Sequence, residues 1–284
     1  MKKRRYKEKL AYLFLTLMVI IILSSVFMMF YFIIFRGIKV INWQFLTQMP
    51  QKGMTAGGIF PAILGTLYLT IGGICFALPL GTSAAIYLTE YADQNRLIRI
   101  IRIGINNLAG VPSVVFGLFG LAIFVKYLNF GVSILSGSLT LGILILPTII
   151  RASEEALSAV PQSFREASLA LGATKWQTIQ KVVLPNSISG ILTGSILSIG
   201  RAAGETAPIL FTAATFYTMR LPNSIFSEVQ TLPYHIYALM TEGTHPESQV
   251  PIAYGTALVL VLLVLGLNLI AFTLRNRFRR SKKW

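Results

Sequence analysis

The chain has 284 residues, of which 54% are hydrophobic and only 12% are charged. Its mean hydropathy is +0.68, whereas about 25% of the residues in an ordinary soluble domain are charged. These values predict an all-α polytopic membrane protein. They exclude a secreted domain, a cytosolic enzyme and a protein with a single membrane anchor.

Six apolar stretches are long enough for a membrane-spanning helix, which needs about 20 residues. They are residues 10–35, 53–89, 103–125, 127–150, 182–219 and 248–274. A basic segment precedes the first stretch, as in a signal peptide. The stretch itself has 26 uncharged residues, more than the 7–15 of a signal h-region, so we expect a retained first helix.

The net charge of +15 does not indicate a nucleic-acid binder, because the basic residues sit in short segments between apolar stretches. If six helices alternate across the membrane, nineteen basic residues fall on one side and five on the other. The nineteen lie in segments 1–9, 91–102, 151–181 and 275–284. By the positive-inside rule, we expect both termini to be cytoplasmic in a bacterial plasma membrane.

The apolar stretches differ in character along the chain. The first, at about 11–35, suits a peripheral helix surrounded by lipid, and residues 36–60 read as an outer loop. From Ile63 onward glycines recur, so helices two to five should form the packed core. One proline falls in each of these four helices, namely Pro79, Pro112, Pro147 and Pro208. These prolines predict kinks around a cavity, although glycine and proline are common in membrane helices generally.

Two polar segments separate the later helices. The outer segment 216–250 is expected to hold a short interfacial helix near 224–241. In the cytoplasmic segment 151–181, Pro161 should begin a helix that runs through Leu171 and stops at Gly172. A second helix should begin at Thr174 as its N-cap and end before Pro185.

The first cytoplasmic helix carries a small and apolar stripe, formed by Phe164, Ala167, Ser168 and Leu171. From this periodicity alone, the helix could dock into the groove of a partner or lie on the lipid headgroups.

The run Glu166-Ala167-Ser168, then Gly172 and then Val182-Val183-Leu184-Pro185 resembles the EAA motif of ABC importer permeases. That motif is usually written E-A-A-x3-G-x9-I-x-L-P. The resemblance implies the MetI-like type I importer fold with six membrane helices. It also implies a coupling helix that docks on a separate ATPase. The residues that it assigns to coupling are Phe164, Glu166, Ala167, Gly172, Leu184 and Pro185.

This resemblance divides the chain into three parts. Residues 1–60 hold the N-terminal tail, the first helix and an outer loop, and residues 61–275 form the permease domain with its coupling segment at 155–185. Residues 276–284 form a basic tail. No G-x-x-x-x-G-K-[ST] motif is present. We therefore expect a transport subunit that is not itself an enzyme and binds no cofactor or metal, with ATP and Mg²⁺ on the partner ATPase.

Arg201 and Glu205 lie inside the fifth apolar stretch. An ionisable residue there costs about 2.5–3.5 kcal/mol on insertion scales, and it usually faces a cavity. The two residues are four apart, so on a helix they can pair with each other. They are either part of a substrate pathway or an ion pair that only packs helices together.

The string Gly200-Arg201-Ala-Ala-Gly204-Glu205-Thr206 resembles a signature of the phosphate-specific permeases of this family, and the chain is more similar to their PstA-type than to their PstC-type subunits. The resemblance implies a phosphate pathway through Arg201, Glu205 and Thr206. The implied partners are a PstC-like second permease subunit, two PstB-like ATPase subunits, an outer PstS-like phosphate-binding protein and membrane lipid, without nucleic acid.

Two other interpretations remain open at this stage. A permease of the same family for sulfate or molybdate would share the fold and the coupling helix. A polytopic membrane enzyme or receptor is a different class, and against it stands the lack of a convergent catalytic set, since both histidines, His235 and His245, fall in one outer segment.

Overall fold

Long helices dominate the structure, a computed structural model that describes residues 2–93, 95–215 and 220–280. Five of them are long and apolar enough to cross a membrane, and a bent pair of helices makes a sixth if it counts as one span. Three of the five are single helices, namely α1 (Lys2–Gly37), α6 (Ile134–Ser158) and α12 (Pro246–Arg280). The other two are made of consecutive elements, and their first elements are α3 (Phe60–Ile86) and α8 (Lys175–Thr178). A π-helical turn, η1 (Tyr87–Tyr91), extends α3, while α8 continues through η3 (Ile179–Val183) into α9 (Leu184–Gly204).

The third predicted helix, over 103–125, is not a single straight helix. It consists of α4 (Arg96–Ala109), followed by α5 (Ser113–Gly120) and η2 (Leu121–Tyr127). The chain bends by 102° between α4 and α5. Pro112 lies at this break as the N-cap of α5, where its missing N–H and fixed φ prevent a continuous helix.

The fifth predicted helix, over 182–219, is also interrupted. It ends at Gly204, and a short helix, α10 (Ala207–Thr212), follows after Glu205 and Thr206. Pro208 explains this ending, because its ring would clash with the Gly204 carbonyl if the helix continued. Residues 216–219 of the predicted helix lie outside the described residues.

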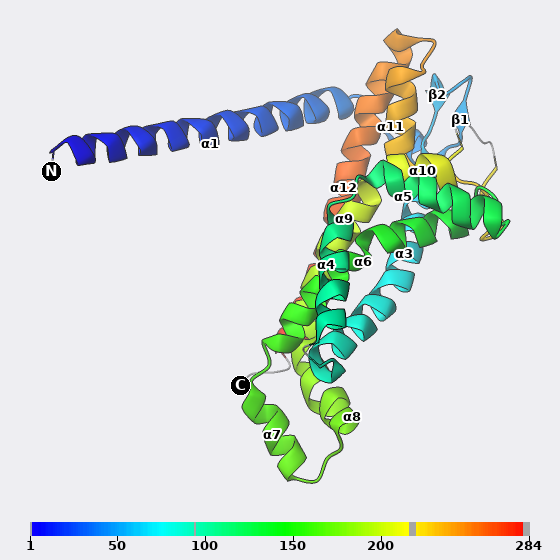
Figure 1. Ribbon diagram of the computed structural model, residues 1–284. Helices are drawn as coiled ribbons and strands as arrows, with labels where there is room; N and C mark the ends of the chain where they lie inside the picture. The colour runs from blue at the N-terminus through cyan, green and yellow to red at the C-terminus, as the bar shows by residue number, and fades with distance from the viewer. Residues whose placement is uncertain (1, 94, 216–219, 281–284) are drawn as a thin grey trace.

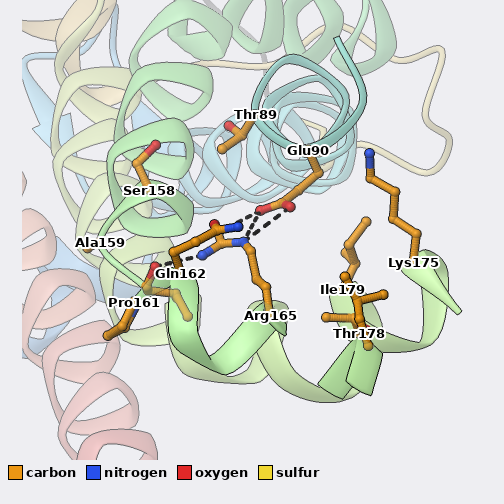
Figure 2. Close-up of a pocket in the computed structure, with 12 residues that line it drawn as sticks. Thr89, Glu90, Ser158, Ala159, Pro161, Gln162, Arg165, Lys175, Thr178 and Ile179 are labelled. Atoms are coloured by element: carbon orange, nitrogen blue, oxygen red, sulfur yellow. Dashed lines mark hydrogen bonds and ion pairs between the residues drawn. The ribbon is translucent and has the colours of Figure 1, made fainter. Parts of the chain in front are cut away.

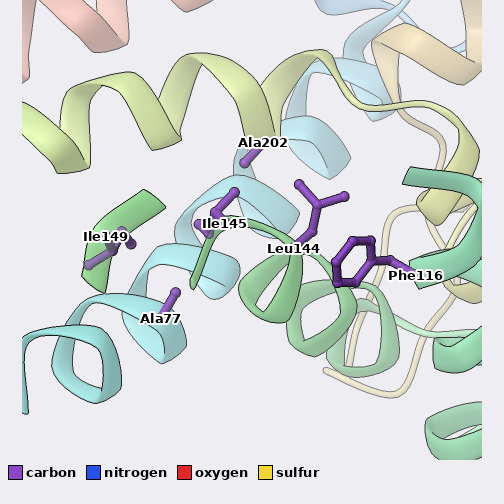
Figure 3. Packing of buried hydrophobic residues seen from close by; sticks show 6 residues of the cluster. All are labelled: Ala77, Phe116, Leu144, Ile145, Ile149 and Ala202. Carbon is purple, nitrogen blue, oxygen red and sulfur yellow. The ribbon is translucent and has the colours of Figure 1, made fainter. Parts of the chain in front are cut away.

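Small residues bring α3, α6 and α9 close together, as the glycine pattern predicts. A side chain at Gly81 of α3 would meet the Ile149 Cγ2 atom of α6 at 2.7 Å, and one at Gly190 of α9 would meet the Ala156 Cβ atom at 2.5 Å. Around these contacts lies a buried cluster that includes Ala77, Leu144 and Ala202 (Figure 3). The core therefore lies between these three helices, whereas most of α4 is exposed.

The first helix is peripheral, as predicted, and no residue of its most apolar 18-residue window is buried. It runs away from the other helices and meets them only at its C-terminal end (Figure 1). There the Arg36 guanidinium lies over the Tyr254 ring of α12, with 5.1 Å to the ring centroid. In the chain by itself, the apolar surface of α1 has no partner over most of its length.

The two ends of the bundle differ in charge and structure (Figure 1). One end, here called the basic end, carries α7 (Gln162–Ala170), α8, the beginning of α4 and the C-terminal end of α12. Three of the four basic segments thus come together, namely 91–102, 151–181 and the described part of 275–284, whereas residues 2–9 of the fourth begin α1, away from this end (Figure 1). Residues 281–284 of the predicted tail 276–284 lie outside the described residues. The opposite end carries α2 (Trp43–Thr47) and a small hairpin of β1 (Pro50–Gln51) and β2 (Ala56–Gly57).

The outer helix predicted near 224–241 is shorter than predicted. It is α11 (Leu232–Thr241), whose residues Leu232, Tyr234, His235 and Leu239 are buried. Because α11 packs against α12 and α3, it forms part of the protein interior. Burial of the His235 ring lowers its pKa from 6.5 to about 4, so this histidine is neutral at pH 7.

A first prediction tests the contact between α3 and α6. Gly81→Ala should destabilise the detergent-solubilised chain by about 1–3 kcal/mol, because the added methyl group overpacks against Ile149. The matched control is Gly104→Ala in α4, where an added Cβ atom meets nothing within 4 Å. Thermal unfolding of both variants measures the difference. Equal unfolding temperatures would contradict the packing described here.

A second prediction concerns pH. Because the pKa of His235 is about 4 in the folded state and 6.5 when unfolded, the unfolded state binds more protons between these values. Stability should therefore fall as the pH drops, by about 2 kcal/mol between pH 7 and pH 5. His235→Gln should remove most of this slope, while His245→Gln, a change at an exposed ring, should keep it. Chemical unfolding at both pH values gives the measurement, and a slope that persists in His235→Gln would refute the assignment.

Candidate functional site

The first cytoplasmic helix forms almost as predicted. It is α7, with Pro161 as its N-cap and Leu171 as its C-cap. Gly172 follows with φ +85°, a left-handed conformation that glycine adopts without strain. Its N–H group donates to the Leu169 carbonyl at 2.9 Å, and the Ala173 N–H donates to the Ser168 carbonyl at 3.2 Å. This pair of bonds is a Schellman motif, which fixes the end of α7.

The side chains of α7 point in two directions. Glu166 and Ala167 are exposed, as is Leu171, whose side chain is 90% exposed. Phe164 is half-buried and packs instead against a buried cluster with Leu157, Val160 and Val183. The exposed face therefore carries Glu166, Ala167 and Leu171, while Phe164 joins α7 to the ends of α6 and η3. An added side chain at Gly172 would meet nothing within 4 Å, which leaves open space beside the backbone.

The second cytoplasmic helix begins as predicted but does not end before Pro185. Thr174 is the N-cap of α8, and it forms a capping box with Gln177. The helix then continues through the π-helical turn η3, in which the Leu184 N–H donates to the Ile179 carbonyl, and into α9 with Pro185 in its first turn. This wider turn shifts the hydrogen-bond register immediately before the proline, which lacks an N–H group. Leu184 and Pro185 thus lie in one continuous, locally widened helix that joins α8 to α9.

An ion pair connects α7 to the end of α3. The Arg165 Nη2 atom lies 2.7 Å from the Glu90 Oε1 atom, and the Arg165 Nε atom lies 3.2 Å from the same oxygen. Arg165 also donates to the carbonyls of Val160 at 2.6 Å and Leu157 at 2.9 Å, at the end of α6. Sequence reasoning missed this pair, because its members are 75 residues apart and neither belongs to a charged cluster.

The predicted pair inside the membrane does form. The Arg201 Nε atom lies 3.5 Å from the Glu205 Oε1 atom, and the side chains are 37% and 16% exposed. Glu205 is not on the helix, however. It is the C-cap of α9, with extended backbone dihedral angles. Arg201 lies one turn before the end of α9 on its exposed face, together with Thr193 and Leu197. Thr206 comes next as the N-cap of α10.

The geometry suggests two kinds of chemistry. The basic end offers α7, a helix with a capped end and an exposed face, and the opposite end of α9 offers a guanidinium that is loosely paired and partly exposed. Within the described residues, no group of three or more His, Cys, Asp or Glu side chains is placed to hold a metal ion.

A helical bundle with five or six candidate membrane spans and a pair of short helices at its basic end has the architecture of a transport permease. The chain belongs to the family of binding-protein-dependent transport system inner membrane components, whose family model matches residues 77–284. It is therefore a multi-pass inner-membrane subunit, and membership in this family of importer permeases implies an ATPase and a substrate-binding partner.

Curated relatives match most of the chain. It is 36% identical over 280 residues to the probable ABC transporter permease protein YqgI of Bacillus subtilis, covering 94% of this chain and 95% of the relative. It is 35% identical to the phosphate transport system permease protein PstA 1 of Mycobacterium tuberculosis, covering 99% of this chain and 91% of the relative.

Solved structures confirm the predicted type I importer fold. A bacterial ABC transporter involved in the import of the acidic polysaccharide alginate aligns with a TM-score of 0.67, at 14% identity over 97% of this chain and 98% of that chain. The inward-facing MetNI methionine ABC transporter aligns with a TM-score of 0.58, at 18% identity over 78% of this chain and 94% of that chain.

A third prediction concerns Gly172. Gly172→Leu should leave the chain inserted in the membrane but reduce the amount of ATPase that co-purifies with it. The side chain adds about 1–2 kcal/mol of backbone strain at φ +85° and fills the open space beside α7.

The matched control for this variant is Gly131→Leu. Gly131 also has a positive φ and open space around it, but it precedes α6 at the opposite end of the bundle. If both variants retain the same amount of ATPase, α7 is not the docking helix.

Proposed function

We propose that this chain is a membrane-spanning permease subunit of an ATP-driven importer that moves inorganic phosphate across the plasma membrane. The observation that carries the proposal is the partly exposed Arg201 guanidinium near the end of α9, within the string Gly200 to Thr206 that resembles the phosphate-specific permeases. The similarity to a PstA protein over nearly the whole chain supports the same substrate.

The pairing of Arg201 suits an anion that binds and then leaves. A guanidinium donates two parallel hydrogen bonds to an oxyanion. Charge-assisted bonds of this kind are usually 2.7–2.9 Å long, whereas the contact of Arg201 with Glu205 is 3.5 Å. In the described part of the chain this is the one ion pair of Arg201, so most of its donors are available. Glu205 can hold the arginine when the pathway is empty, and Thr206 adds a hydroxyl group beside it.

Coupling to the ATPase is assigned to α7. The exposed Glu166 and Ala167, together with Gly172, would form the docking face. Leu184 and Pro185 would transmit movement, because they lie where α8 and η3 pass into α9. Phe164 would act from the inner side of α7 by packing it against the ends of α6 and η3. ATP and Mg²⁺ would be bound by the ATPase and not by this chain.

The remaining partners are those that the resemblance to the phosphate-specific permeases implies, and the exposed surfaces of the chain offer places for them. A second, PstC-like permease subunit would cover exposed faces such as those of α1 and α4, and two PstB-like ATPases would bind at the basic end. A PstS-like phosphate-binding protein would dock at the opposite end. This orientation would make the basic end and the C-terminal end of α12 cytoplasmic, and the positive-inside rule assigns the N-terminal segment 1–9 to the same side.

A fourth prediction tests Arg201. Arg201→Ala should reduce phosphate uptake by at least about tenfold without loss of the assembled complex, because the planar pair of donors is lost. Arg201→Lys should reduce uptake less, since an ammonium keeps the positive charge but not the two parallel donors of the guanidinium. Glu205→Gln should have the smallest effect. Uptake of labelled phosphate into proteoliposomes that contain the complete importer measures each variant.

The double variant Arg201→Ala with Glu205→Ala separates this role from simple packing. If the pair only packs helices, Arg201→Ala alone should lower the amount of folded protein, because it leaves an unpaired charge inside the membrane. The double variant should then restore both protein and uptake. Full uptake by the double variant would remove Arg201 from the pathway, and uptake of sulfate or molybdate in place of phosphate would change the assigned substrate.

A further inference from the structure

Arg165 holds three separate parts of the basic end together. Its guanidinium pairs with Glu90 in η1 at 2.7 Å and donates to the carbonyls of Leu157, near the end of α6, and Val160, just beyond it. The side chains of Arg165 and Glu90 are only 13% and 9% exposed. One residue of the docking helix is therefore bonded both to the extension of α3 and to the end of α6.

The ion pair between Arg165 and Glu90 lies at the wall of a pocket. A pocket of about 700 Å³ lies between α7, α8 and the ends of α3 and α6, and Glu90 and Arg165 both line it (Figure 2). In Figure 2 the Arg165 side chain reaches from α7 toward Glu90. A second bridge comes from α8, where the Lys175 Nζ atom lies 4.8 Å from the centre of the Tyr91 ring. The contact between the docking helices and η1 thus depends on polar side chains more than on close backbone packing.

The extension of α3 is in turn bonded to α4. The Arg102 Nη2 atom donates to the Leu88 carbonyl of η1 at 2.9 Å and lies 3.3 Å from the Glu154 Oε1 atom of α6. A continuous set of bonds therefore runs from α7 through Glu90 and η1 to α4. A displacement of α7 can reach α3 and α4 by this route, in addition to the covalent route through α8 into α9.

We propose that Arg165 is a positioning residue that couples the docking helix to α3, so that the ATPase moves α3 and α4 together with α9. The proposal rests on the proposed function, because it requires that α7 docks on the ATPase. A guanidinium suits this role, since its planar fork binds one carboxylate and two carbonyls at once, and a lysine ammonium does not reproduce that geometry.

The test uses the complete importer with its second permease subunit, ATPases and phosphate-binding protein in proteoliposomes. Glu90→Gln and Arg165→Lys should retain the co-purified ATPase and its ATP hydrolysis. Phosphate uptake per ATP should fall at least about fivefold, the lower end of the range for linked sites. The matched control is Glu155→Gln, which removes an exposed carboxylate from the same end of α6. Normal uptake per ATP in both test variants would overturn the proposal.

A second variant separates coupling from folding. Glu90→Leu combined with Arg165→Met removes both charges, so it avoids the unpaired buried charge that a single change leaves. We expect this double variant to assemble and still to be uncoupled. If it assembles with normal uptake per ATP, the ion pair is only structural and the proposal is wrong.

A distance measurement gives a readout that does not depend on uptake. Spin labels at Ser163→Cys in α7 and Tyr87→Cys in η1, in a Cys75→Ser background, should give one narrow distance distribution both without nucleotide and with ATP trapped. The distribution should broaden in Glu90→Gln. A distance that changes between the two wild-type states contradicts the rigid connection. If instead the wild-type chain binds no ATPase, the proposed function itself fails.

Discussion

Close contact between α3, α6 and α9 is the constraint on which the rest of the structure depends. Lipid tails are as apolar as leucine side chains, so membrane helices associate mainly where small residues let their backbones approach. Here α6 contacts both neighbours, with Gly81 of α3 against Ile149 and Gly190 of α9 against Ala156. This packing fixes the end of α6, from which α7 follows directly. It also fixes the axis of α9, which carries Arg201.

Three arginines show how one residue type serves different purposes in this fold. Arg102 donates to the Leu88 carbonyl in η1, and Arg165 donates to the Leu157 and Val160 carbonyls at the end of α6, so both arginines connect neighbouring elements. Arg201 differs, because its contact is 3.5 Å and its side chain is 37% exposed, against 2.7 Å and 13% for Arg165. The Arg165 guanidinium connects helices through short, buried contacts, whereas the loosely paired Arg201 guanidinium is the one that we propose for the substrate pathway.

Local signals in the sequence predicted local structure well. Gly172 and Thr174 were correctly placed as a helix end and an N-cap, because both positions depend on the chemistry of a few neighbouring residues. The breaks in the third and fifth helices fall at or near the prolines that predicted kinks, but the sequence did not predict the size of these breaks. Proline marks a break but does not say whether a helix kinks or reverses, and the bend of 102° at Pro112 depends on what the two halves pack against. Burial of α11 and the Glu90–Arg165 pair depend on contacts between distant segments, which no local pattern reveals.

In the proposed function, this chain takes part in phosphate import, and α7 transmits the movement of an ATPase to the membrane helices. The most direct measurement is ATP hydrolysis by the reconstituted importer after addition of the outer binding protein, loaded with either phosphate or sulfate. We expect hydrolysis to rise with phosphate-loaded protein and to be accompanied by phosphate uptake, with little response to sulfate. Equal stimulation by both anions, or hydrolysis that does not respond to the loaded protein, would contradict the proposed function.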